Sequence, residues 1–443
     1  MKKVLLSLFL LSCSASAGLA QDSFWTMEQC MRYAVENSTA VKKQMYENDS
    51  RKADFTSAAL GFLPSFSAGV STQYNFGRAI DPETNTYVNT TTFNNYYGLS
   101  ASLPVFYGGQ IVNQYRLAKS NRQSGMNDLQ KIKDDLALNT LEAFVNVVYY
   151  RGTVRFAEEK LEESNRTLYK ICRQEELGIK GMADVAQVRA QVAGDDYNLT
   201  RQQNAYNAAL LRLKEYMNYP YDEELQPDTA MYGNEYLTGT ESVADIYEYA
   251  REMNPAALQA AYQLKANRLY LLMQKGSLFP SLSFSTGVNT SYYDNLQSEM
   301  PLPSFNSQFK NNRGEYVSLS LNIPLFNRLS RLRDIRRAGN NVRIAEEQQS
   351  EVLRRLQTVI EQSVLERDGY AKESVQMEKK LESDRIAYEI TVRKFEEGLM
   401  SPLDLQTSAN VLIESRANLL QRQLMYLLKC KQVDYYKGEP LVK

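Results

Sequence analysis

The sequence repeats itself after about 220 residues, and this duplication constrains the fold more than any other feature. Three landmarks recur at a nearly constant spacing: Pro64 and Pro280, Pro104 and Pro324, and Glu176-Leu-Gly178 and Glu396-Glu-Gly398. The first pair lies 216 residues apart, and the other two pairs lie 220 residues apart. Because the offset hardly changes across a whole half, the sequence predicts two copies of one structural unit.

Each half shows the same order of patterns. A helical stretch over residues 27–60 or 243–276 leads to two strands, and a very long helical stretch follows over 107–177 or 327–397. A glycine turn and a return helix end each half, near residues 218 and 436. Thr26 and Ser242 are placed to cap the first helix of each half. We therefore expect an α+β fold with a first repeat at 21–220, a linker at 221–241, a second repeat at 242–436 and a tail at 437–443.

The chain begins like a secreted protein. Two lysines, an apolar stretch from Val4 to Leu11 and small residues up to Ala20 predict a signal peptide over residues 1–20. We expect cleavage after Ala20, with Ala17 as the alternative, and a weak lipobox before Cys13 leaves lipid attachment there as a further alternative. No later run approaches the ~20 apolar residues of a membrane helix. The secreted chain is thus either soluble or crosses a membrane as strands.

The cysteines do not form a disulfide framework. Cys30, Cys172 and Cys430 remain after the signal peptide, and they are odd in number and widely spaced. Cys30 and Cys430 could pair, but isolated buried thiols are the expected state.

Four segments alternate apolar and polar residues with the period of two that marks a strand with two different faces. They run over residues 66–76, 96–105, 282–292 and 317–323, with longer loops expected at 77–95 and 293–314. Each segment has about ten residues, the length that crosses a bilayer when tilted. Their polar positions are mostly small Ser, Gly and Asn, which suits the lining of a lumen better than the charged surface of a soluble sheet.

Four such strands cannot close a barrel by themselves. An open edge in lipid would leave backbone N–H and C=O groups without partners. The chain is therefore expected to oligomerise, and three copies would supply twelve strands to one closed barrel.

The long helical stretches carry apolar residues at steps of three and four, the repeat of a helix that packs along one side. About 70 residues at 1.5 Å each span about 105 Å, far more than the core of one domain. This pattern alone also fits a soluble coiled-coil stalk.

Prolines mark all four expected junctions between strands and helices: Pro64, Pro104, Pro280 and Pro324. Proline fixes φ and removes a backbone donor, so it can end a strand ladder and set the direction of the next helix.

With these features the chain resembles the TolC-type outer-membrane efflux family over its whole mature length. The resemblance rests on the duplication, the four proline junctions and two hairpin turns, the second of which is Phe395-Glu-Glu-Gly398-Leu-Met-Ser401-Pro-Leu-Asp404-Leu405. It implies a homotrimer with a twelve-stranded β-barrel in outer-membrane lipid and a long α-barrel in the periplasm. It further implies a tripartite efflux or type I secretion system, with a periplasmic adaptor and an inner-membrane transporter of RND or ABC type.

The resemblance also implies where the channel narrows. The aperture would lie at the hairpin turns, with Asp404 and Asp184 at acidic positions of the family. Two family positions differ here, because a second carboxylate is replaced by Thr407 and a basic residue by Met400. The adaptor would meet the turns at Gly178, Gly398, Phe395, Ser401 and Leu403. From the residues alone, Asp404 is equally explained as a first-turn acid of its return helix, and for Asp184 this explanation is the favoured one.

Other classes of protein fit the sequence less well. The chain has no histidine and shows no nucleophile–base pair or metal motif, so we expect neither an enzyme nor a cofactor. A formal net charge of −1 gives no basic excess for nucleic acid. The alternative function is a trimeric surface adhesin with a coiled-coil stalk, but its strands would gather at one end of the sequence.

Overall fold

The computed structural model describes residues 24–80, 85–229, 242–297 and 302–442. The expected signal peptide, Cys13 and residues 230–241 of the expected linker lie outside these ranges. The described start of the linker is held to the N-terminal segment, because the Trp25 and Asp228 N–H groups donate to the carbonyls of Gln226 and Trp25, each at 2.8 Å.

The chain forms two compact units. The helical unit comprises residues up to Val41, Ile132–Tyr247 and from Val359 onward, and the strand unit comprises Lys42–Lys131 and Glu248–Thr358. Helices α2, α3, α5 and α8 contribute residues to both units. No described helix is both long enough and apolar enough to span a membrane.

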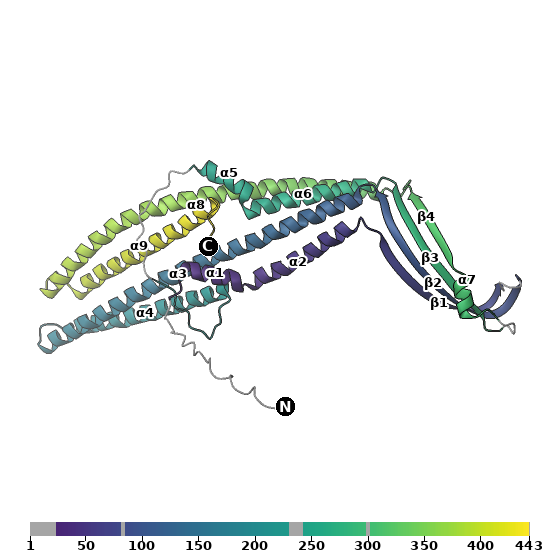
Figure 1. Ribbon diagram of the computed structural model, residues 1–443. Coiled ribbons are helices and arrows are strands. Elements are labelled where there is room, and N and C mark those ends of the chain that lie inside the picture. The colour runs from purple at the N-terminus through teal and green to yellow at the C-terminus, as the bar shows by residue number, and fades with distance from the viewer. Residues whose placement is uncertain (1–23, 81–84, 230–241, 298–301, 443) are drawn as a thin grey trace, which may run out of the picture. The chain divides into compact units, whose positions relative to one another are not determined.

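The duplication is confirmed element by element (Figure 1). The first repeat contains α1 (Met27–Asn37), α2 (Thr39–Leu60), α3 (Gln110–Glu176) and α4 (Met182–Met217). The second contains α5 (Val243–Met253), α6 (Pro255–Gly276), α8 (Ser330–Glu396) and α9 (Pro402–Tyr436), with the additional short helix α7 (Phe305–Asn311). Helices α1 and α5 have 11 residues each, α2 and α6 have 22, and α3 and α8 have 67.

The first helical stretch of each half is two helices rather than the single one predicted. Ser38 adopts an extended backbone and its hydroxyl accepts a hydrogen bond from the Val41 N–H at 3.3 Å. Asn254 is likewise extended and accepts from the Ala256 N–H at 2.9 Å. Pro255 disfavours helical backbone at Asn254, so this break has a direct cause in the sequence.

All four strands form one antiparallel sheet in the order β1–β2–β3–β4 (Figure 1). They are β1 (Ser65–Ile80), β2 (Tyr87–Tyr107), β3 (Ser281–Asn295) and β4 (Gly314–Asn322). The loop predicted at 77–95 is wrong, because β1 and β2 stay paired out to Ile80 and Tyr87. Tyr, Thr and Phe favour strands there without a clear apolar alternation, so the period of two did not reveal the extension.

The pairing register places like residues opposite each other on both faces of the sheet. Phe66 lies opposite Ala101, Val70 opposite Tyr97 and Leu282 opposite Leu321 on one face. The other face pairs small polar residues, such as Ser67 with Ser100 and Ser283 with Ser320. The apolar face is open to the surroundings in the single chain, where Phe66 is 74% and Val317 is 73% exposed.

The prolines occupy three of the four predicted junctions. Pro64 and Pro280 directly precede β1 and β3, and Pro324 follows the end of β4. Pro104 instead lies inside β2, where the pairing with β3 shifts register between Pro104 and Phe106. A proline within a central strand cannot donate to the ladder, and an irregularity of this kind accommodates it.

The core of the helical unit lies where α1 packs against α3 and α4. Its buried residues include Cys30, Phe144, Val147, Leu213 and Met217. Cys30, Cys172 and Cys430 are all free thiols as expected, but of the three only Cys30 is buried, and Cys172 and Cys430 are half-buried. Burial raises the pKa of the Cys30 thiol to about 12, which keeps it protonated and unreactive.

Candidate aperture at the helical hairpin turns

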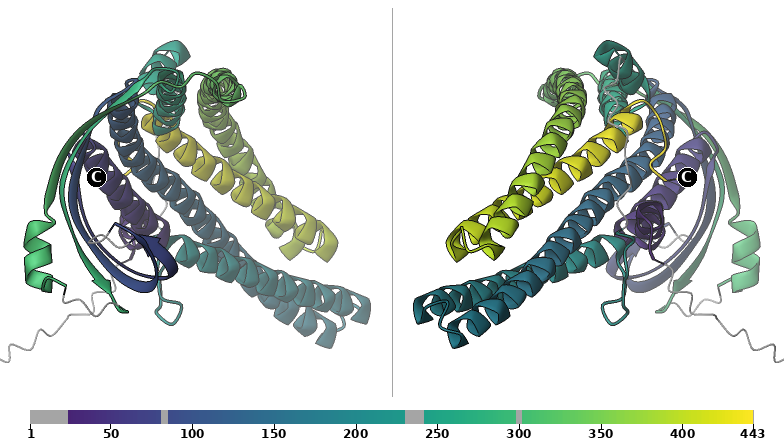
Figure 2. Two further views of the ribbon diagram at one scale, coloured as in Figure 1. Left: turned by 90° about the vertical axis from the view of Figure 1, so that its right-hand side faces the viewer. Right: turned by 90° about the vertical axis from the view of Figure 1, so that its left-hand side faces the viewer.

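Each repeat folds its two long helices into a hairpin, α3 with α4 and α8 with α9 (Figure 2). The first turn covers residues 177–181 and the second covers 397–401. Gly178 has φ +74° and Gly398 has φ +77°, a left-handed backbone that only glycine adopts without strain. The Gly178 and Gly398 N–H groups donate to the carbonyls of Glu175 and Phe395 at 2.9 and 3.0 Å. The two turns therefore reverse the chain by the same backbone device.

The return helices begin with the acids singled out from the sequence. Asp404 accepts hydrogen bonds from the Ser401 N–H at 3.0 Å and from its hydroxyl at 2.7 Å, and the Ser401 hydroxyl accepts from the Asp404 N–H at 3.3 Å. These bonds hold the pKa of the Asp404 carboxyl below its usual range. Asp184 accepts from the Gly181 N–H at 3.2 Å, but glycine has no side chain to complete the exchange. Asp404 is exposed and Asp184 is half-buried.

The other residues predicted at the second turn divide into exposed and packed ones. Thr407 is exposed and its hydroxyl donates to the Leu403 carbonyl at 2.9 Å. Leu403 is 55% exposed. Met400 is half-buried, and Phe395 packs against the cluster around Ile171 in the first hairpin. Phe395 therefore stabilises the contact between hairpins and is not an exposed apolar contact at the turn.

Sequence reasoning missed the largest exposed apolar side chains of the turns. Leu177, Ile179 and Met182 at the first turn are 75%, 67% and 69% exposed, and Leu399 at the second is 71% exposed. They lie beside the turn glycines, so the signal was present as apolar residues at positions where a surface turn normally carries polar ones. With Leu403 they form the exposed apolar turn set.

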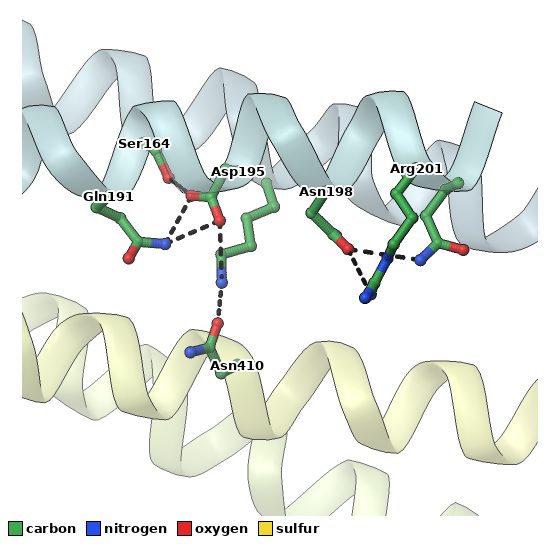
Figure 3. Close-up of polar contacts among 8 residues, drawn as sticks. Ser164, Gln191, Asp195, Asn198, Arg201 and Asn410 are labelled. Carbon is green, nitrogen blue, oxygen red and sulfur yellow. Dashed lines mark hydrogen bonds and ion pairs between the residues drawn. The ribbon is translucent and has the colours of Figure 1, made fainter. Parts of the chain in front are cut away.

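A buried polar cluster lies between the helices of the first hairpin and reaches the second (Figure 3). Lys160 lies 3.5 Å from Asp195, and each of these two side chains is only 9% exposed. Asp195 also accepts hydrogen bonds from the Ser164 hydroxyl and from the Gln191 amide. Lys160 donates further to Asn410 of α9. A buried charge is tolerated only with such partners, so this cluster fixes α3, α4 and α9 to one another.

The second hairpin contains the same cluster with two residues exchanged. Lys380 lies 2.7 Å from Asp384 and donates to the Ser415 hydroxyl at 2.6 Å, and Ser415 also donates to Asp384. By the offset of 220, Lys380 corresponds to Lys160, Asp384 to Ser164, and Ser415 to Asp195. Each hairpin thus joins one lysine, one aspartate and one serine. The aspartate lies on the return helix α4 in the first hairpin and on the long helix α8 in the second, and the serine takes the other helix in each case. The hydrogen bonds from Lys380 and Ser415 lower the pKa of Asp384.

A small cavity of about 40 Å³ lies beside the first cluster, between α3, α4 and α9. Its walls include Glu163, Thr167, Gln187, Pro402 and Gln406. Burial raises the pKa of Glu163, against the attraction of Lys160. The described residues include no group of acidic or thiol side chains placed to hold a metal ion.

Comparison with known proteins gives the family. The sequence model described as "Outer membrane efflux protein" matches residues 31–219 and 246–433, one match for each repeat. A comparison with curated protein sequences gives no match.

Solved structures of low sequence identity share the fold. The outer membrane channel CmeC of Campylobacter jejuni has a TM-score of 0.81 at 16% identity, over 94% of this chain and 87% of CmeC. The outer membrane protein VceC of Vibrio cholerae has 0.78 at 13%, over 94% and 96%. The Neisseria gonorrhoeae MtrE channel in its open state has 0.64 at 15%, over 94% and 89%. The family matches cover both repeats, and the chain therefore belongs to the outer membrane efflux protein family, a family of outer-membrane channel proteins and not of enzymes.

Proposed function

We propose that three copies of the chain form one passive channel across the outer membrane. The observation that carries this proposal is the sheet, which has one exposed apolar face, one face of small polar residues, and two outer strands, β1 and β4, with an unpaired edge each. Lipid contains no water to satisfy those edges, so they need partners. Pairing β4 of one copy with β1 of the next would satisfy both edges and close twelve strands into a barrel.

The helical hairpins would continue the same duct into the periplasm. Each chain supplies two hairpins, so three copies supply twelve long helices around one axis. The duct conducts passively in this proposal, while an inner-membrane transporter of RND or ABC type loads the substrate. A periplasmic adaptor opens the tip by binding the exposed apolar turn set, because side chains that are more than half exposed in the single chain lose unfavourable contact with water on docking.

The acidic residue of the second turn gives the closed tip its selectivity. Three Asp404 carboxylates would face a common axis, and the lowered pKa keeps them ionised at neutral pH. A ring of carboxylates attracts cations and repels anions.

Single-channel recording in planar bilayers tests this ring. We expect Asp404→Asn to reduce the preference for cations severalfold, because the variant removes the charge. Ser401→Ala is the matched control, since it removes the two hydrogen bonds between the Ser401 hydroxyl and Asp404 and leaves the carboxylate charge. An unchanged cation preference in Asp404→Asn would reject the ring, and an equal loss in both variants would assign the effect to the cap.

A further inference from the structure

The two hairpins of one chain contact each other where α9 packs against α3 and α4, and we call this contact the hairpin seam. Arg416 of α9 pairs with Glu159 of α3 at 2.8 Å, and its guanidinium lies 6.0 Å from the centre of the Phe156 ring. Farther along, the Tyr435 hydroxyl of α9 donates to the Asp134 carboxylate of α3 at 3.1 Å. Polar side-chain pairs therefore stabilise the hairpin seam at separate positions along α3 and α9.

In a ring built from copies of a duplicated chain, a contact like the hairpin seam occurs at two kinds of place. Within one chain the second repeat meets the first, and between chains the second repeat of one copy meets the first repeat of the next. Head-to-tail contacts of this kind close into a ring when the rotation from one copy to the next returns to the start. Because the offset of 220 holds along both hairpins, positions on α9 correspond to positions on α4, and positions on α3 correspond to positions on α8. This step rests on the proposed function, which supplies the ring.

We infer that Lys379 of one copy pairs with Asp196 of the next copy across the seam between chains. Lys379 is the counterpart of Glu159, and Asp196 is the counterpart of Arg416. Compared with the pair within the chain, both charges have the opposite sign. The contact between chains therefore also joins one positive and one negative side chain. A change of only one sign would have placed like charges opposite each other, which is unfavourable.

A second level of the seam agrees with this correspondence. The counterparts of Asp134 and Tyr435 are Arg354 and Glu215, again two opposite charges. Two other polar pairs between the hairpins, Lys160 with Asn410 and Lys170 with Glu396, have the counterparts Lys380 with Ala190 and Ile390 with Glu176, which offer no polar match. The contact between chains therefore contains fewer polar side-chain pairs than the hairpin seam within the chain.

Burial identifies the corresponding face of α4 as one that lacks a partner in the single chain. Residues of α9 that are buried on the side of the first hairpin have exposed counterparts on α4: Pro402 and Met182, Ala409 and Arg189, and Leu420 and Thr200. On the other side, Lys160 is buried whereas its counterpart Lys380 is exposed. Asp196 and Lys379 are both exposed, and neither forms an ion pair with another residue in the described ranges. A second copy of this chain fits both faces by their pattern of exposure and by charge.

Thiol crosslinking tests the pair directly. Lys379→Cys and Asp196→Cys are combined in the full-length protein, and outer-membrane fractions are treated with a short bis-maleimide. We expect most of the chain to migrate as a covalent trimer, because each copy supplies both halves of the contact. Glu159→Cys with Arg416→Cys calibrates the reach of the reagent, and it should give a crosslinked peptide within one chain and no change in size.

Matched controls separate the seam from accidental pairing. Lys379→Cys with Gly194→Cys should stay uncrosslinked, because residue 194 lies about 200° around α4 from residue 196. The two single-cysteine variants report any reaction with Cys30, Cys172 or Cys430. If a lysine-reactive reagent yields a trimer but the Lys379/Asp196 cysteine pair does not, this pairing is wrong while the channel stands. If neither reagent yields an oligomer, the ring and the pairing both fail.

Charge reversal gives a second measurement that needs no crosslink. Lys379→Glu and Asp196→Lys should each lower the temperature at which the trimer dissociates in detergent, since each puts like charges together. The double variant should restore most of the loss. A double variant no better than the singles would overturn the pairing.

Discussion

At the scale of single residues, the two repeats make the same corner between a strand and the following long helix with different amino acids. Between β2 and α3 the backbone is left-handed at Gly108 and Gly109, with φ +58° and +77°. Before α8, at the same places in the second repeat, Arg328 and Leu329 hold φ +55° and +61°. The left-handed conformation costs a residue with a Cβ about 1–2 kcal/mol. Gly108 has an additional reason to be glycine, since a Cβ there would collide with the Gly276 carbonyl.

We predict that Leu329→Gly stabilises the protein, because it removes this strain. The free energy of unfolding should rise by at most about 1–2 kcal/mol. The conformational entropy that a new glycine adds to the unfolded chain reduces this rise. The midpoint of thermal unfolding in detergent measures it. Gly109→Leu is the reciprocal variant and should lower the midpoint, since its added Cβ has room but the wrong φ. A lower midpoint for Leu329→Gly would contradict the account of the corner.

At the scale of elements, the sequence predicts the hairpins well and their interior poorly. The offset of 220 and the two turn glycines predicted four long helices and two glycine turns, because these depend on local residues. The lysine clusters could not be predicted in this way. Ser164 and Asp384 look like an unrelated substitution when the repeats are aligned, and so do Asp195 and Ser415. Only the packing of two helices reveals that one exchange compensates the other.

This exchange predicts the behaviour of a swap variant. Asp195→Ser alone leaves Lys160 buried without a carboxylate, which typically costs about 3–5 kcal/mol. Adding Ser164→Asp should recover most of that loss, because it recreates the arrangement of the second hairpin. Chemical unfolding of the purified protein measures both. Asp384→Ser should cost less than Asp195→Ser, since the Lys380 side chain is 52% exposed. A swap no more stable than Asp195→Ser would show that the two clusters are not equivalent.

At the scale of the whole molecule, the duplication explains how one chain could supply two-sixths of the proposed ring. The alternating strands predicted one sheet, and the structure adds that β1 and β2 extend well beyond the predicted segments. Polar Thr and Asn residues continue the strands there, and apolar alternation cannot detect them. The sheet presents an apolar face with two outer strands, and Asp196 of α4 and Lys379 of α8 form no ion pair with another described residue. Each of these features is explained by further copies of the same chain.

Crosslinking of the native protein in fractionated cells tests this account most directly. The protein is treated with a lysine-reactive reagent before the membranes are dissolved, and its size and its fraction are then determined. We predict a species of three chains in the outer-membrane fraction. A single uncrosslinked chain in the soluble fraction would contradict the account.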